Sequence, residues 1–264
     1  MRTIAIVNQK GGTGKSTTAV NLAAALAEHG RRVLIIDLDP QYSATSWYAV
    51  ESPGGGLSDL FIEPDSVTLK DLIRETATAG VSIVPATPRL GSAERSLAGD
   101  SGAETILREK LSGLSDDQFD YVLIDCPGNL GLLTGNALTA VQEVLIPVES
   151  HVMGVQGLAQ LMQKVEQVRK RLNPGLTVGG ILACRVDSRT RHSLEVVETL
   201  RERFADTTYR TVIRENVKLA ECPSMGCPIM TYAPTSNGSE DYRKLATEVI
   251  EQEGRGAYGK AANS

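Results

Sequence analysis

Residues 4–18, which read IAIVNQKGGTGKSTT, decide the fold of this 264-residue chain. A strand-length apolar run leads into a glycine-rich turn, and the turn leads directly into a segment with the apolar spacing of a helix. Gly11, Gly12 and Gly14 leave room for backbone N–H groups to converge on an anion, and the positive end of the helix adds to the attraction. The stretch therefore predicts a strand, a phosphate-binding loop and a helix, in that order.

The side chains of this loop have the chemistry that a nucleotide and its metal ion require. Lys15 can reach the β- and γ-phosphates, and the Ser16 hydroxyl can bind Mg²⁺. A second lysine, Lys10, precedes the glycine pair. We expect the nucleotide-binding residues of the loop itself to be Gly11, Gly12, Thr13, Gly14, Lys15, Ser16 and Thr17.

Outward from the loop, apolar runs of strand length alternate with segments of helical spacing. The runs are rich in Val and Ile and lie at 2–8, 32–37, 81–86, 121–125, 143–148, 179–186, 211–213 and 228–232. Helical spacing occurs at 19–26, 158–172 and 242–250, and the Gly- and Pro-containing stretch 51–66 predicts a loop. The alternation predicts an α/β fold with a doubly wound, mostly parallel sheet and helices on both faces. We expect a single domain over residues 1–253 and a flexible C-terminal tail over 254–264.

Composition restricts the classes of function. The chain is 41% apolar and 22% charged, and its 27 Lys and Arg against 32 Asp and Glu give a net charge of −5. Any binding to DNA or to a membrane must therefore come from a local patch. The chain has no apolar run of 18 residues and no secretory signal, which predicts a cytoplasmic protein. Its four cysteines are expected to be reduced, and Cys222 and Cys227 lack the further ligands of a zinc site.

Two further apolar runs end in carboxylates. The first run is followed by the residues Asp37, Asp39, Pro40 and Gln41, and the second ends in Asp125 before Pro127 and Gly128. Because the carboxyl ends of parallel strands meet at one edge of a sheet, we expect these groups beside the phosphate loop. A carboxylate there can hold Mg²⁺ through water or orient an attacking water, although a strand-end Asp can also be a simple helix cap.

The loop departs from the common G-x4-G-K-[ST] pattern, because Gln9 holds the position of the first glycine. With Lys10, it instead resembles the loop of the deviant Walker A ATPases, the ParA/MinD family, which reads K-G-G-x-G-K-[ST]. The resemblance implies ATP and Mg²⁺ as cofactors. It also implies a nucleotide-sandwich homodimer in which Lys10 reaches the phosphates bound by the partner, and slow ATP hydrolysis that a partner protein stimulates.

The same resemblance gives roles to the strand-end residues. Residues 37–41 look like the D-x-D-P-Q segment of the family, and residues 121–128 look like its Walker B strand. By this analogy Asp39 positions or activates the attacking water, and Ser16 and Asp125 hold Mg²⁺, partly through water. The catalytic residues so implied are Lys10, Lys15 and Asp39. The switch residues so implied are Asp37, Asp39, Pro40, Gln41, Asp125, Pro127 and Gly128.

Residues 211–232 resemble a segment that reads I-P-R-N-V-R-x-S-E-A-P-S-x-G-x-P in small chromosomal ParA proteins of the Soj type. The matching residues are Asn216, Lys218, Glu221, Pro223, Ser224, Gly226 and Pro228. Arg214 stands where Pro is usual, Glu215 stands where Arg is usual, and His151 replaces a common Glu. The resemblance covers nearly the whole chain.

A DNA-binding surface is expected from the local charge of residues 185–218. This stretch holds eight Lys and Arg against six Asp and Glu, within a chain of negative net charge. Such a patch can neutralise a few phosphates without reading the base sequence. The alternative is an ordinary solvated helix face with mixed charges. The candidate DNA-binding residues are Arg185, Arg189, Arg191, Arg214 and Lys218.

Together these features predict a ParA-type ATPase that segregates or positions a chromosome, a plasmid or a protein compartment. Its expected partners are a second copy of the chain, non-specific DNA and a ParB-like or cargo adaptor protein, in the cytoplasm at the nucleoid. No membrane partner is expected, because the C-terminal segment lacks the basic and apolar faces of an amphipathic anchor. No operator-binding domain is expected ahead of a loop that begins by residue 10. The alternatives are a P-loop ATPase of a small-molecule pathway, a MinD-like positioning regulator, and a nucleotide-bound scaffold without turnover.

Overall fold

The computed structural model describes residues 1–50 and 56–261, and of residues 152–156, 206 and 254–261 it describes the backbone alone. The strands are β1 (Arg2–Ile6), β2 (Val33–Asp37), β3 (Arg74–Glu75), β4 (Val81–Val84), β5 (Tyr121–Asp125), β6 (Glu143–Glu149), β7 (Thr177–Val186) and β8 (Ile213–Arg214). They form one sheet in the order β3-β4-β2-β5-β1-β6-β7-β8. Neighbouring strands pair in parallel, except for β3 and β4, which pair antiparallel. The predicted α/β fold with a mostly parallel sheet is confirmed.

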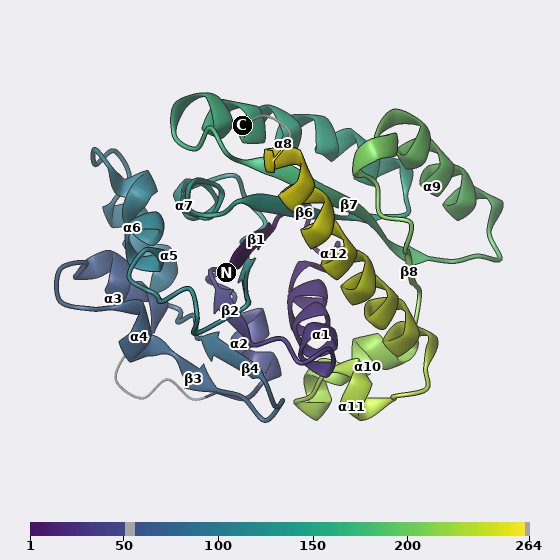
Figure 1. The fold of residues 1–264 in the computed structure, drawn as a ribbon, viewed down its shortest axis with the longest axis horizontal. Coiled ribbons are helices and arrows are strands. Elements are labelled where there is room, and N and C mark those ends of the chain that lie inside the picture. Colours follow the sequence, from purple (N-terminus) through teal and green to yellow (C-terminus); the bar gives the residue numbers. More distant parts are fainter. Residues whose placement is uncertain (51–55, 262–264) are drawn as a thin grey trace.

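Helices cover both faces of the sheet (Figure 1). They are α1 (Lys15–Glu28), α2 (Ser43–Trp47), α3 (Leu57–Ile62), α4 (Leu69–Leu72), α5 (Leu90–Ser96), α6 (Ile106–Leu111), α7 (Leu132–Ala140), α8 (Val152–Arg171), α9 (Arg191–Arg203), α10 (Val217–Met225), α11 (Ile229–Tyr232) and α12 (Asn237–Ala261), with short 3-10 helices at Ala103–Thr105 and Ala205–Thr207. Helices α1 and α12 lie side by side on one face, whereas α7, α8 and α9 belong to the other.

The alternation of side chains along the central strands divides the core in two. In β1, Ile4 and Ile6 join the hydrophobic cluster under α1 and α12, whereas Ala5 joins the cluster under α7 and α8. Both faces of the strand are therefore buried, which explains why its sequence is nearly continuously apolar and does not alternate. A strand buried in this way fixes the position of the loop that follows it.

The apolar run 228–232, which predicts a strand, is instead the short helix α11. Pro228 precedes this helix, and the Ile229 N–H donates to Asn21 Oδ1 of α1 at 2.8 Å. An apolar run this short has no period that separates a strand from one helical turn. The antiparallel strand β3 was missed for a related reason, since its two residues, Arg74 and Glu75, are polar.

Two further boundaries differ from those that the sequence predicts. The predicted loop 51–66 contains helix α3, and its residues 51–55 lie outside the described residues. Helix α12 continues to Ala261, well beyond the helical spacing at 242–250 and into the predicted tail. The flexibility of residues 254–264 stays a prediction.

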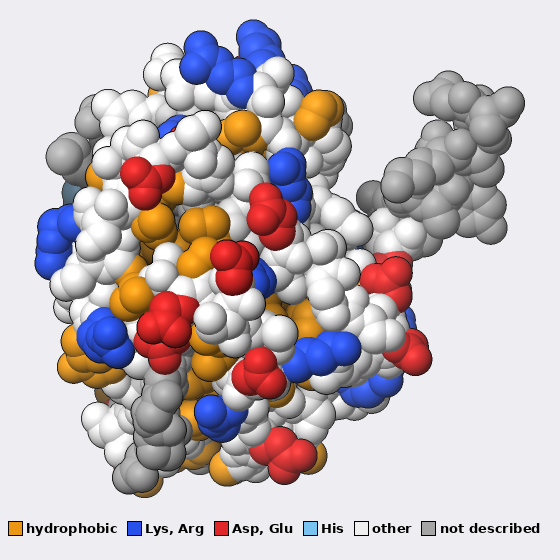
Figure 2. All heavy atoms as spheres, turned by 90° about the vertical axis from the view of Figure 1, so that its left-hand side faces the viewer, with side chains coloured by type: hydrophobic (Ala, Val, Ile, Leu, Met, Phe, Trp, Pro, Cys, Tyr) orange, Lys and Arg blue, Asp and Glu red, His pale blue; other side chains and the backbone are white. Residues whose placement is uncertain are grey.

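Over the face that carries α3 to α6, acidic and basic side chains are interspersed, with hydrophobic side chains visible between them (Figure 2). All four cysteines are free thiols. In the described part of the chain, no helix combines the length and the apolarity that crossing a bilayer requires.

Candidate active site

The phosphate loop connects β1 to α1 at the carboxyl edge of the sheet. Gly12 and Gly14 have φ angles of +78° and +91°, a left-handed conformation that side chains disfavour. Gly14 is the N-cap of α1 and has no capping side chain, so the free N–H groups of the first helical turn remain available to a ligand. The backbone thus requires Gly12 and Gly14, two of the three glycines that the sequence singles out.

A cleft of about 1000 Å³ opens over this loop. Its lining includes the predicted site residues Gly11, Gly12, Gly14, Lys15, Ser16, Thr17, Asp39, Pro40, Gln41, Pro127 and Gly128. The fold therefore brings the predicted phosphate loop and both predicted switch segments to one cavity.

Lys15 is nearly buried, with 8% of its surface exposed. Its Nζ donates to the Lys10 carbonyl oxygen at 3.5 Å, which is a long hydrogen bond. A Cβ atom added to Gly128 would lie 3.8 Å from this Nζ, so the second switch segment passes beside it. A buried ammonium with one weak acceptor is well placed to bind an anion that enters the cleft.

Asp37 and Asp125 lie side by side because they are register partners at the ends of β2 and β5. Both carboxylates are fully buried. Asp37 accepts hydrogen bonds from the Thr45 N–H at 2.8 Å, from the Thr45 hydroxyl at 2.7 Å and from the Asp39 N–H at 3.2 Å. Burial raises the pKa of Asp37 to about 6, although these hydrogen bonds act in the opposite direction. Asp37 therefore anchors the first switch segment to α2.

Asp125, by contrast, is a buried side chain without a hydrogen-bond partner on either oxygen among the described residues. Burial raises the pKa of Asp125 well above its ordinary value and the charge of Asp37 raises it further, whereas Ser16 and Lys15 lower it. A buried carboxylate left in this state is costly unless a cation satisfies it. The carboxylate of Asp125 and the hydroxyl of Ser16 are oxygen ligands of the type that Mg²⁺ prefers, so these two residues fit the ion.

Asp39 is half-buried and lines the cleft. Its carboxylate accepts a hydrogen bond from the Gln41 N–H at 2.9 Å, which fixes the turn after β2. Unlike Asp37, Asp39 faces the cavity and retains acceptor capacity for a water. The arrangement suits a group that orients a nucleophile, and its catalytic role stays a prediction.

Lys10 does not line the cleft. Its Nζ lies 2.7 Å from Glu149 Oε2 at the end of β6, and its N–H donates to Asn8 Oδ1 at 3.0 Å. Thr13, also predicted to bind nucleotide, is buried and donates to the Lys10 carbonyl oxygen at 3.3 Å. In the subunit by itself, the ammonium of Lys10 is therefore held by β6.

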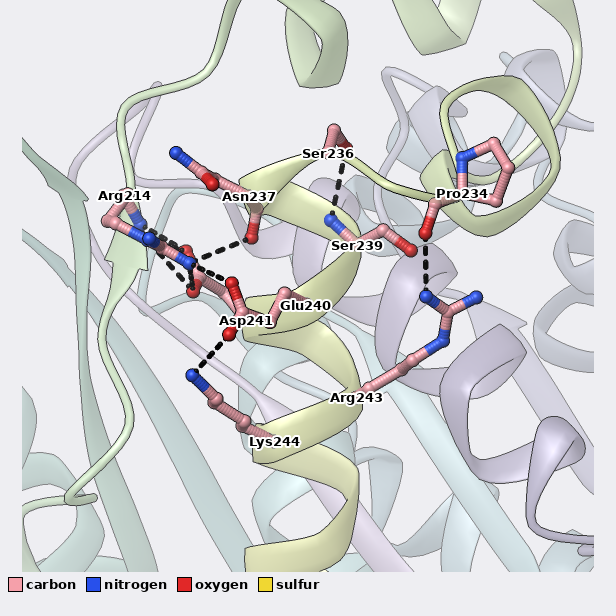
Figure 3. Close-up of polar contacts among 9 residues, drawn as sticks. All are labelled: Arg214, Pro234, Ser236, Asn237, Ser239, Glu240, Asp241, Arg243 and Lys244. Carbon is pink, nitrogen blue, oxygen red and sulfur yellow. Dashed lines mark hydrogen bonds and ion pairs between the residues drawn. The ribbon is translucent and has the colours of Figure 1, made fainter.

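The predicted DNA-binding residues all have carboxylate partners. The pairs are Arg185 with Glu149 and Glu215, Arg189 with Asp187, Arg191 with Glu195, Arg214 with Glu240 and Asp241, and Lys218 with Glu221. Arg214 differs from the others, because it reaches from β8 to two carboxylates on α12, where Lys244 pairs with Glu240 in turn (Figure 3). Arg214 therefore ties β8 to α12, and its contact with DNA stays a prediction.

The sequence analysis missed three residues that support the site. Thr45 of α2 holds Asp37, and Glu94 of α5 accepts a hydrogen bond from the Leu133 N–H in the first turn of α7 at 3.2 Å. Spacing along the chain does not reveal either residue, since α2 and α5 reach the site through tertiary packing. Glu149 is different, because it directly follows the predicted strand 143–148 at the same edge as the loop, and that position was a usable signal.

This phosphate loop, with carboxylates at the neighbouring strand ends, defines a P-loop ATPase of the ParA/MinD type. The model of an AAA domain family, AAA_31, matches residues 1–178. The chain is 44% identical over 246 residues to the sporulation initiation inhibitor protein Soj of Bacillus subtilis, covering 93% of this chain and 97% of that protein. It is 45% identical over 250 residues to the chromosome-partitioning ATPase Soj of Thermus thermophilus, covering 95% and 96%. The chain belongs to the ParA/Soj family of chromosome-partitioning ATPases.

Solved structures agree with this assignment. A cobyrinic acid a,c-diamide synthase from Mycobacterium smegmatis, with bound ATP analog and magnesium, is 31% identical with a TM-score of 0.84 and coverage of 97% of both chains. The cell division ATPase MinD of Pyrococcus furiosus is 28% identical with a TM-score of 0.78, covering 95% of this chain and 99% of that one. These likenesses confirm the predicted fold and the ATPase class.

Proposed function

We propose that this chain is an ATP-driven partitioning switch. ATP and Mg²⁺ close two subunits into a sandwich dimer, and the dimer binds DNA non-specifically at the nucleoid. A ParB-like or cargo adaptor protein then stimulates slow hydrolysis, which releases the DNA. The observation that carries the proposal is the buried carboxylate of Asp125, which lies near Ser16 and Lys15 and has no hydrogen-bond partner in the described part of the chain, in a member of the ParA/Soj family.

The residues divide this work among themselves. The loop N–H groups and Lys15 bind the phosphates, and Ser16 and Asp125 hold Mg²⁺, which supplies neutralisation of phosphate charge when bound. Asp39 orients the attacking water. In the structure from Mycobacterium smegmatis an ATP analog and magnesium are bound, which supports both cofactors.

The switch consists of two segments, one on each side of the cleft, and the γ-phosphate holds both in place. In residues 37–41, Asp37 is anchored by its hydrogen bonds with Thr45, and Asp39 lines the cleft. Residues 125–128 pass beside Lys15 Nζ. Loss of the γ-phosphate removes the contact that holds both segments, so the dimer relaxes after hydrolysis.

The second candidate is an ATPase of a small-molecule pathway, which the likeness to a cobyrinic acid a,c-diamide synthase favours. In that case a metabolite, and not DNA with a protein partner, would raise the ATPase rate. A MinD-like regulator would bind lipid vesicles when loaded with ATP, and a scaffold would bind ATP without releasing phosphate.

The deciding experiment measures retention of the full chain on non-specific duplex DNA in low salt, with ADP, with ATP and with a slowly hydrolysed ATP analogue. We expect retention only with the triphosphates, falling steeply as salt rises. Lys218→Glu and Arg189→Glu should lose it, whereas Lys170→Glu, the same charge reversal at an exposed residue of α8, should keep it. Retention in no nucleotide state would reject DNA binding and turn attention to the metabolic and scaffold alternatives.

A further inference from the structure

The ammonium of Lys10 is held within its own subunit by Glu149. The Nζ to Oε2 distance is 2.7 Å, and the two side chains are 43% and 22% exposed. The hydrogen bond from Lys10 lowers the pKa of Glu149, so this carboxylate is charged at neutral pH. Nothing in the loop motif requires such a partner, because Glu149 lies on β6 and Lys10 lies between β1 and α1.

The backbone of Lys10 is fixed independently of this ion pair. Its N–H donates to Asn8 Oδ1 at 3.0 Å, and Asn8 Nδ2 donates to the Pro147 carbonyl oxygen at 2.6 Å. The Lys10 carbonyl oxygen accepts from Thr13 and Lys15. The loop is thus tied to the end of β6 through Asn8, and the flexible stem of Lys10 can move its ammonium without moving the loop.

Glu149 has a second partner that remains when Lys10 leaves. Its Oε1 lies 3.1 Å from the guanidinium of Arg185. The backbone of Arg185 has a φ angle of +55°, which is unusual for a residue other than glycine. This residue lies where the register between β7 and β8 shifts. Release of Lys10 therefore does not leave an unpaired carboxylate, which lowers the cost of the release.

We propose that Glu149 is a positioning residue that competes with the triphosphate for Lys10. In the nucleotide-free subunit it keeps the ammonium directed at β6, and the larger negative charge of the triphosphate bound by the partner subunit draws the ammonium away. The inference rests on the proposed sandwich dimer, in which Lys10 contacts the phosphates bound by the partner subunit. Because the pair is partly exposed, it is a weak competitor, and removing it should tighten nucleotide binding by about two- to fivefold.

The test is a calorimetric titration of the full chain with a slowly hydrolysed ATP analogue and Mg²⁺. Glu149→Gln should lower the apparent dissociation constant by about two- to fivefold at low salt, and the gain should shrink at high salt. The matched control is Glu166→Gln, which removes the same charge from an exposed pair in the C-terminal half of α8 and should leave the constant unchanged. A merely structural role for Glu149 would weaken binding.

A second comparison isolates Lys10. In a Lys10→Ala background, Glu149→Gln should have no effect on the dissociation constant, because the competition has been removed. An unchanged or raised constant for Glu149→Gln alone, or the same gain in the Lys10→Ala background, would overturn the inference. A wild-type chain that binds no analogue would instead overturn the proposed function, so the two failures can be told apart.

Discussion

The phosphate-loop edge of the sheet and the basic stretch 185–218 both concentrate charged side chains, but these side chains differ in burial and in pairing. At the loop, Lys15 and Asp125 are buried and incompletely partnered. In the basic stretch, each candidate cation lies within 4 Å of a carboxylate, and all but Arg214 are more than half exposed. Burying a charge without a partner costs several kcal/mol, whereas an exposed pair contributes about 1 kcal/mol or less.

The difference shows which of the two regions is already arranged to bind a ligand. At the loop edge, a bound anion and a bound cation would offset the cost of burying Lys15 and Asp125. The five candidate cations of the basic stretch already have carboxylate partners, so DNA there must compete with the protein's own carboxylates. Variants at the loop should therefore have large effects and variants in the stretch small ones.

The largest effect is expected for Lys15→Ala. This change removes the buried ammonium at the base of the cleft, and the ATPase rate should fall roughly 100- to 1000-fold, with loss of nucleotide binding. Steady-state phosphate release and calorimetric titration measure the two effects, with Lys170→Ala as the control. Unchanged affinity for ATP in Lys15→Ala would show that this loop does not bind the nucleotide.

Asp39→Ala should separate binding from turnover. Because Asp39 faces the cleft while Asp37 carries the structural hydrogen bonds, the variant should bind ATP normally and hydrolyse it about 100-fold more slowly. Light scattering should then show a dimer that persists with ATP. A normal turnover number would exclude Asp39 from catalysis.

The raised pKa of Asp37 predicts that the stability of the fold depends on pH when nucleotide and Mg²⁺ are absent. Its pKa is raised from 3.8 to about 6, so the folded state keeps a proton that the unfolded state has lost. This group therefore lowers the free energy of unfolding as the pH rises through that interval, by about 2 kcal/mol between pH 4.5 and 7.5. Asp37→Asn should remove most of this decrease in urea unfolding, whereas the exposed Asp65→Asn should retain it. Equal pH slopes in Asp37→Asn and the wild type would contradict the assignment.

The loop edge was predictable from sequence because local order and strand burial determine it. The glycines, Lys15 and the strand-end carboxylates follow directly from apolar runs, and parallel pairing then brings Asp37 and Asp125 together. The short helix α11 was not predictable, because its apolar run fits a strand equally well. Charge counting also failed to show that the candidate cations of the basic stretch are paired, since several of their partners lie outside the stretch and meet them only through packing.

Long-range side-chain pairs mark the limit of sequence reasoning. Arg214 meets Asp241 across 27 positions of sequence, and Lys10 meets Glu149 across 139. No periodicity or sequence motif connects the residues of either pair. Only the packing of α12 against β8, or of β6 beside β1, brings these partners together.

The smallest effect expected distinguishes Arg214 from the other cations of the basic stretch. Asp241 is buried and takes hydrogen bonds from the Arg214 N–H and guanidinium, so Arg214→Met should leave a buried carboxylate short of partners and lower the free energy of unfolding by about 1–2 kcal/mol. Arg191, which is 93% exposed beside Glu195, should give nearly unchanged stability in Arg191→Met. Urea unfolding measures both. The opposite result would be that Arg214→Met is as stable as Arg191→Met but loses DNA retention. Arg214 would then belong with the exposed DNA-binding cations, and its ion pairs with α12 would not be its main role.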